Sequence, residues 1–251
     1  MPDTGNETWD DDIARMKLSD VEKNGLQVYR NYTAAFDKQK IDIFCNEIDA
    51  VNHDLSELSR VCQLLRVEDP RTAPLILCAY VDDLLKKALK ASIPDGVPGG
   101  KAELFKSFGP MASFDSRLKI AYAFGLCGTD ILTSINIVRD VRNVIAHNWR
   151  FDELERVWAL KRMGDLPSMV RILGEQTTAD FSDLSEQSQL RIQCIWLAGR
   201  FSYEAPLWWR AKGKQLSPFQ ALYGSDRQPK VLRSIAEICF VATHEIASDA
   251  Q

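Results

Sequence analysis

The sequence predicts an all-α protein, and three observations support this. Apolar residues recur every three or four positions over long stretches, which is the period of an α-helix. Alternation with a period of two is nearly absent, as are runs rich in Val, Ile and Thr, so strands are not indicated. Ser or Thr precedes several helical stretches, and Gly or Pro follows them. We therefore expect the 251 residues to form a bundle of helices.

The N-terminal part begins with a polar, acidic tail over residues 1–10. A weak helical pattern over 11–32 is interrupted by Asn24-Gly25, which predicts a broken helix. Thr33 is a candidate cap for a long helix that reaches Leu65, and Glu68-Asp69-Pro70 stops it.

The middle of the chain predicts three helices that pack together, 75–89, 114–126 and 130–149. Thr72 before Pro74 favours the start of the first helix. Ser113 is suited to cap the second, while Gly128 ends it and Thr129 starts the third. Residues 94–100, rich in Pro and Gly, predict a loop, which a short helical piece over 102–108 follows.

The C-terminal part predicts a helix over 152–163 and a less regular stretch to residue 182. Two long helical patterns follow, over 184–203 and 230–246. Between them, residues 206–227 contain two prolines and predict an irregular segment.

Composition limits the possible functions. The net charge of −4 and a pI of about 5.5 argue against tight non-specific DNA binding, although a local basic patch stays possible. The six cysteines stand singly, without a C-x-x-C pair, which is typical of reduced core thiols in a cytoplasmic protein. An acidic N-terminus and the lack of a run of roughly 18 apolar residues predict neither export nor membrane insertion.

Arg142 interrupts the apolar face of the third central helix. That face consists of Ile131, Ile135, Val138, Val141, Ile145 and Trp149. A buried, unpaired guanidinium would cost several kcal/mol, so we expect an acidic group or a ligand to face it. Asn143 and His147 lie one helical turn apart on a neighbouring polar stripe, together with Asn136.

The segment F-G-P-M-A-S-F-D-S-R-L-K-I-A-Y-A-F-G-L, with I-V-R-D-V-R-N-V-I-A-H-N after a short turn, resembles the mannitol-operon-repressor (MtlR/MltR-like) family over roughly residues 70–155. Its R-N-x-x-x-H run is similar to the R-x(4–6)-H signature of the HEPN superfamily. The resemblance implies a HEPN-like helical bundle, often dimeric, that cuts RNA without metal through Arg and His from two protomers. It would make Arg142, Asn143 and His147 the catalytic residues.

The same resemblance divides the chain into three parts. Residues 69–160 would form the helical core, 1–68 an acidic tail with a helical extension, and 161–251 a C-terminal helical extension. Asp82, Asp83 or Asp140 would support the site by orienting Arg142. The alternative is structural: Arg142 pairs with Asp82 or Asp140, and His147 caps a helix end. The D-D-L-L-K-K run around Asp82 is also typical of a solvated face with pairs four residues apart.

A second basic and aromatic run lies in the C-terminal part. It is suited to bind single-stranded RNA or, alternatively, to anchor an irregular segment on the core. Its residues are Trp208, Trp209, Arg210, Lys212 and Lys214. His53 and His244 lack partners at metal-ligand spacing, and nucleotide-binding motifs are absent, so we expect neither a metal nor a cofactor.

Two functions follow as hypotheses. The first is a HEPN-like RNA-binding or RNA-cleaving homodimer, within a toxin or phage-defence system and with an antitoxin-like protein partner. The second is a non-enzymatic transcriptional regulator that acts through protein contacts. The sequence lacks a helix-turn-helix with a basic recognition helix, so direct operator binding is disfavoured.

Overall fold

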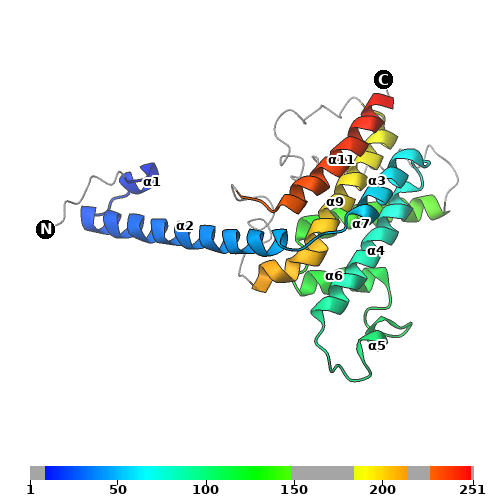
Figure 1. Ribbon diagram of the computed structural model, residues 1–251, viewed down its shortest axis with the longest axis horizontal. Helices are drawn as coiled ribbons and strands as arrows, with labels where there is room; N and C mark the ends of the chain where they lie inside the picture. Colours follow the sequence, from blue (N-terminus) through cyan, green and yellow to red (C-terminus); the bar gives the residue numbers. More distant parts are fainter. Residues whose placement is uncertain (1–8, 148–183, 214–226, 250–251) are drawn as a thin grey trace.

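The computed structural model describes residues 9–147, 184–213 and 227–249. These residues form helices and no strand, which confirms the all-α prediction. Figure 1 shows a bundle from which one long helix, α2, extends to the side. The helices are α1 (Asp11–Ala14), α2 (Asp20–Asp49), α3 (Ser56–Val67), α4 (Ala73–Ser92), α5 (Lys101–Phe105), α6 (Phe114–Ala123), α7 (Thr129–His147), α9 (Glu186–Gly213) and α11 (Lys230–Asp249).

The first long helix begins earlier than predicted and is not broken at Asn24-Gly25. Ser19 caps it: its hydroxyl accepts from the Glu22 N–H, and the Glu22 carboxylate accepts from the Ser19 N–H in return. One glycine in a helix interior costs only about 1 kcal/mol relative to alanine, too little to interrupt a helix of 30 residues. The break lies upstream instead, between α1 and Ser19.

The predicted helix from Thr33 to Leu65 is divided in the structure. Thr33 lies inside α2, where its hydroxyl donates to the carbonyl of Tyr29 at 2.9 Å, so it caps nothing. The chain turns after Asp49, and Asp54 then accepts from the Ser56 N–H at 2.9 Å as α3 begins. The predicted stop at 68–70 is confirmed, because α3 ends at Val67.

The central elements agree with prediction except for the end of α6, which lies at Ala123 and not at residue 126, because the chain already turns at Gly125, whose φ is +66°, and not at Gly128. Thr72 precedes α4, which has a proline in its first turn, and residues 94–100 form the expected loop. The Ser113 hydroxyl accepts from the Ser116 N–H at 3.1 Å and caps α6. Helices α4, α6 and α7 pack together, as predicted for the three central helices.

The C-terminal helices are longer than predicted. Helix α9 continues to Gly213, so the expectation of an irregular segment from residue 206 is wrong over 206–213. The rest of that segment to 226, and the predicted helix at 152–163, lie outside the described residues. The helix predicted over 230–246 is confirmed as α11.

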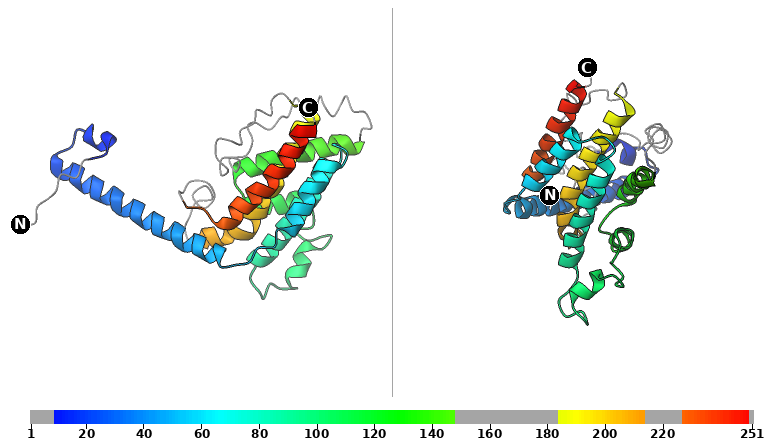
Figure 2. Two further views of the ribbon diagram at one scale, coloured as in Figure 1. Left: turned by 45° about the horizontal axis from the view of Figure 1, so that its top comes forward. Right: turned by 90° about the vertical axis from the view of Figure 1, so that its right-hand side faces the viewer.

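The bundle is built around α4 and α9. Helix α4 packs against α3, α6, α7 and α9, while α9 also packs against α3 and α11 (Figure 2). The C-terminal turns of α2 join this core through Phe44 and Ile48, each at most 1% exposed. The core thus draws on residues from all three predicted parts of the chain. Its packing does not test the boundaries at 68/69 and 160/161, and the second lies outside the described residues.

All six cysteines are free and buried, as the sequence predicted. Burial raises the pKa of the Cys45 and Cys78 thiols to about 11. Among the described residues, no helix combines the length and the apolar character that crossing a membrane requires.

Candidate functional site

Helix α7 carries the predicted site residues. Its apolar face is held against the bundle, because Ile131, Ile135, Val138 and Val141 are fully buried. Helix α4 covers most of this face, and α6 packs beside it. The last turns of α7 therefore have a fixed orientation, and their remaining side chains are presented at the edge of the bundle.

Arg142 is half-buried, less deeply than its place on the apolar face predicts. It lies close enough to α4 for its charge to oppose, in part, the rise that burial causes in the pKa of Cys78. Within the described residues it forms no ion pair and no hydrogen bond. The predicted pairing of Arg142 with Asp82 is therefore not found among the described residues.

Asn143 and His147 are both exposed. Helical spacing places them one turn apart, and His147 is the last residue of α7. The preceding turn of the same polar stripe is already engaged: Arg139 donates to Asp115 of α6 at 2.6 Å and to Asn136 at 3.0 Å. Hydrogen bonding from Lys119, and then from Arg139, lowers the pKa of Asp115.

The acids predicted to orient Arg142 have other roles. Asp82 accepts from the Nε of Arg117 at 2.7 Å and pairs with Lys86 at 2.8 Å. Asp83 pairs with Lys87 at 2.7 Å, so the i,i+4 interpretation of this run is confirmed for both lysines. Asp140 is half-buried on α7.

The deeply buried guanidinium of this region is Arg117, which the sequence reasoning did not select. It is 4% exposed and also donates to the carbonyls of Met111 and Ala112, at 2.6 and 2.8 Å. A helical projection of α6 contains the signal, because Arg117 shares a face with the buried Leu118 and Ala121. The acid needed to confirm it lies 35 residues earlier in the sequence.

For the basic and aromatic run at 208–214, the structure describes the backbone alone, as far as Gly213. Its residues to Gly213 belong to α9, but the side chains of Trp208, Trp209, Arg210 and Lys212 lie outside what the structure describes, as does Lys214 altogether. Whether they bind nucleic acid or anchor the segment stays a prediction.

Potential metal ligands do not gather in the described part of the chain. The ring of His53 lies 3.0 Å from the carbonyl of Ile48, and that of His244 lies 3.4 Å from the Ser248 hydroxyl. Both histidines therefore take part in local contacts, His53 with the last turns of α2 and His244 within α11.

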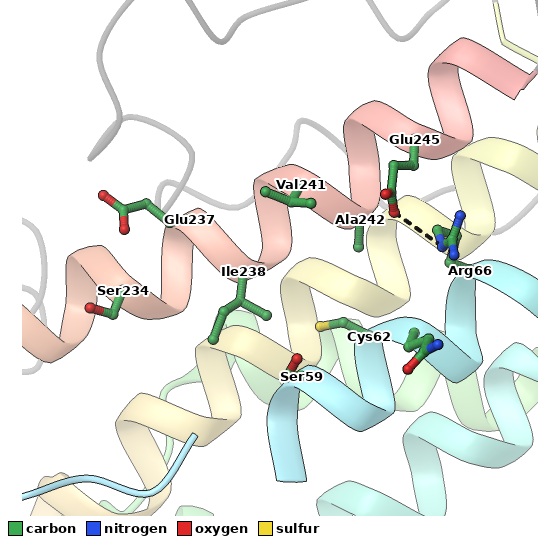
Figure 3. Close-up of a pocket in the computed structure, with 10 residues that line it drawn as sticks. Ser59, Cys62, Arg66, Ser234, Glu237, Ile238, Val241, Ala242 and Glu245 are labelled. Carbon is green, nitrogen blue, oxygen red and sulfur yellow. Dashed lines mark ion pairs between the residues drawn. The ribbon is translucent and has the colours of Figure 1, made fainter. Parts of the chain in front are cut away.

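A groove between α3 and α11 is a feature that the sequence reasoning missed (Figure 3). Its volume is about 530 Å³, and Arg66 and Glu245 form an ion pair of 3.1 Å at one end. Glu237, which also lines it, pairs with Arg233. The charged lining residues thus already have protein partners. Their residue types are ordinary, and only the packing of two helices distant in sequence brings them together.

Comparison with protein-family models, with curated proteins and with solved structures found no match to this chain.

Proposed function

We propose that this chain is a HEPN-like RNA-binding protein that cleaves RNA without a metal ion, with Arg142, Asn143 and His147 as its site. The observation that carries the proposal is the state of Arg142. It is a half-buried cation beside α4, without a carboxylate partner in the described residues, on the same short stretch as two exposed polar groups. A guanidinium in that state is suited to bind a phosphate through two fixed hydrogen bonds.

The three side chains match the needs of metal-free RNA cleavage. The 2′-hydroxyl must lose a proton, the leaving 5′-oxygen must gain one, and the negative charge on the phosphorane must be stabilised. An imidazole such as His147 serves as base or acid, and Arg142 supplies the positive charge. Asn143, one turn before His147, would hold the imidazole or a phosphate oxygen.

One histidine performs only one of the two proton transfers. We therefore propose that two protomers meet around a two-fold axis at the ends of α7, so that one His147 acts as base and the other as acid. Protein partners such as an antitoxin would act by covering these exposed helix ends.

The test is cleavage of single-stranded RNA by the full chain in excess EDTA. The wild type should produce fragments with 2′,3′-cyclic phosphate ends, because the 2′-hydroxyl is the nucleophile. Arg142→Ala and His147→Ala should each lower the rate at least about a hundredfold. Since neither side chain has a partner among residues 9–147, 184–213 and 227–249 that its loss would leave unpaired, each substitution should change the free energy of unfolding by under about 1 kcal/mol.

Matched controls come from exposed positions on α11. His244→Ala removes another exposed histidine, and Arg233→Ala an arginine whose side chain is 76% exposed. Both should cleave as the wild type does. Equal cleavage by wild type and His147→Ala, or none by the wild type on varied RNAs with any co-purified partner removed, would exclude the nuclease.

The second candidate is a non-enzymatic regulator that works through protein contacts. Two observations favour it: the net charge of −4, which disfavours a broad nucleic-acid surface, and the exposed apolar residues of α2. An inactive wild type with intact RNA and stable protein complexes would support this candidate.

A further inference from the structure

Helix α2 is anchored at both ends but exposed in between. In its N-terminal half, Arg30 pairs with Asp10, which directly precedes α1, and with Asp12 in α1, each at 2.7 Å. At its end, Phe44 and Ile48 enter the core. All residues from 31 to 36 are exposed, and Figure 1 shows this stretch crossing open space between α1 and the bundle. Isolated helices of this length are marginal in water, so an unsupported stretch of this kind favours a covering partner.

The exposed stretch carries an apolar stripe on the side opposite the anchored face. We define the α2 stripe as Val21, Val28, Tyr32, Phe36 and Ile43, which are 81, 59, 70, 47 and 43% exposed. At 100° per residue they fall within an arc of about 80°. The anchored residues Arg30, Phe44 and Ile48 lie about opposite. The rings of Tyr32 and Phe36 stack on each other at 6.3 Å.

The stripe is symmetric about Tyr32. Val28 and Phe36 each lie four residues from it, and Val21 and Ile43 each lie eleven. We propose that this stripe is the interface with a second copy of the chain, paired antiparallel with its α2. In that register Tyr32 lies on the two-fold axis, Val28 faces Phe36 of the second copy, and Val21 faces Ile43 of the second copy. In that register each apolar residue of the α2 stripe faces an apolar residue of the second copy, so the stripe is self-complementary, as an isologous contact requires.

The charges beside the stripe match the same register. Glu22 and Lys40 lie on the same side of the α2 stripe, both at about 80° from Tyr32 around the helix axis. Glu22 precedes Tyr32 along the chain and Lys40 follows it at a similar separation. Antiparallel pairing brings Glu22 of each copy within about two residues of Lys40 of the other, so that Lys40 lies beside a carboxylate that also accepts from Ser19. In the single chain, Lys40 lies over the Phe36 ring at 4.3 Å and has no carboxylate partner among the described residues.

Gly25 is a further feature of α2 that favours a close contact with a second copy of this helix. It falls within the arc of the stripe, seven residues before Tyr32, and faces Gln39 of the second copy, seven residues after it. Its φ is not positive, and a Cβ built on it would meet nothing within 4 Å, so the single chain does not require glycine there. A glycine in an exposed helix interior is unfavourable by about 1 kcal/mol relative to alanine. The close approach of a second helix would explain why glycine is nevertheless found at this position.

This contact is separate from the one in the proposed function. Helix α7 ends on the side of the bundle away from the free end of α2, so pairing through α2 leaves the two His147 residues apart (Figures 1 and 2). The stripe would span about 33 Å at 1.5 Å per residue. Because its mean spacing is close to 3.6 residues per turn, the two helices would pair with little supercoil.

The mass of the full chain in solution tests the proposal, by light scattering from micromolar concentrations upward. With the α2 contact alone the wild type should be a dimer, and with the α7 contact formed as well it should be larger than a dimer. Tyr32→Glu places two carboxylates on the axis and should raise the dissociation constant at least tenfold. Ala34→Glu is the matched control: it adds the same charge two residues away, at an exposed position outside the stripe, and should leave the dimer intact. Far-UV circular dichroism should show both variants equally helical.

A cross-linking experiment fixes the register. Tyr32→Cys should form an inter-chain disulfide under mild oxidation, because the two introduced thiols meet at the axis, while Ala34→Cys should stay reduced. The native cysteines are buried and do not interfere. A monomeric wild type would overturn the proposal and leave the stripe to a different protein. A dimer that Tyr32→Glu does not weaken, or equal cross-linking at 32 and 34, would also overturn it without affecting the proposal for RNA cleavage.

Discussion

Arg117 connects three parts of the central bundle through one side chain. Its guanidinium is held by Asp82 of α4 and by two carbonyls of the segment before α6, while its backbone belongs to α6. A buried charge is tolerated when hydrogen bonds and an opposite charge satisfy it, and Arg117 has both. The residue thus fixes the position of α6 on α4.

We predict that Arg117→Ala lowers the free energy of unfolding by about 3–5 kcal/mol, since the Met111 and Ala112 carbonyls lose their donor and the partly buried Asp82 keeps, among the described residues, only its pair with Lys86. Urea denaturation measures this change. Lys119→Ala is the control: its side chain is 72% exposed in an i,i+4 pair with Asp115, and it should change stability by less than about 1 kcal/mol. Equal effects of the two substitutions would contradict the role given to Arg117.

Arg142 and Arg117 together show what a sequence pattern conveys about a single residue. Both interrupt the apolar face of their own helix, so the sequence pattern places both on the side that is expected to face the core. It does not tell whether neighbouring helices cover that turn. Arg117 faces α4, whereas Arg142 lies in the last turns of α7, where it is half-buried. The candidate residues could therefore be selected from sequence, but their burial and their ion pairs could not.

Helix starts were predictable where a local capping signal existed. Thr72, Ser113 and Thr129 each precede or begin a helix as expected. The errors have physical causes. Asn24-Gly25 does not break α2, because the cost of one glycine is small in a long helix. The turn between α2 and α3 was missed because it lacks Pro and Gly and is determined by the packing of α3 on α4 and α9.

Helix α1 has only four residues and depends on its contact with α2. Hydrogen bonding from Arg30 lowers the pKa of Asp12 to about 2 and also lowers that of Asp10. A lowered carboxyl pKa favours the folded contact above the ordinary value, and the contribution is lost as the pH falls through the lowered value. The docking of α1 should therefore persist at pH 4 and be lost towards pH 2.

We predict that Arg30→Ala releases α1 at neutral pH without unfolding the bundle. Hydrogen exchange should show the amides of Ala14 and Arg15, which bond to Asp10 and Asp11 in the wild type, exchanging at the rate of an unstructured chain. The core helices should keep their protection. Arg233→Ala, a surface arginine on α11, should leave α1 protected. Unchanged exchange in Arg30→Ala would show that the burial of Ile13 and the hydrogen bonds with Asn24, Gln27 and Lys23 suffice to hold α1.

At the scale of the whole molecule, periodicity sufficed for the fold class and for the contact among α4, α6 and α7. It did not predict that α9 and α11 share one core with them, nor that most of α2 extends from it. Long-range packing depends on which apolar faces fit each other. Because every one of these helices has an apolar face, periodicity alone does not tell which pairs of helices meet. The groove between α3 and α11 arises only from that packing.

The buried thiols provide a last prediction for the whole fold. Burial raises the pKa of Cys45 and Cys78 to about 11, which favours the neutral thiol in the folded state. A raised thiol pKa stabilises the fold below the ordinary value of 9.0, and this stabilisation is lost as the pH rises towards 11. At pH 8 a disulfide reagent should therefore label all six cysteines rapidly in guanidinium but none at a comparable rate in the native chain. Rapid native labelling of even one thiol, located by mass spectrometry, would identify a helix that opens far more readily than its burial implies.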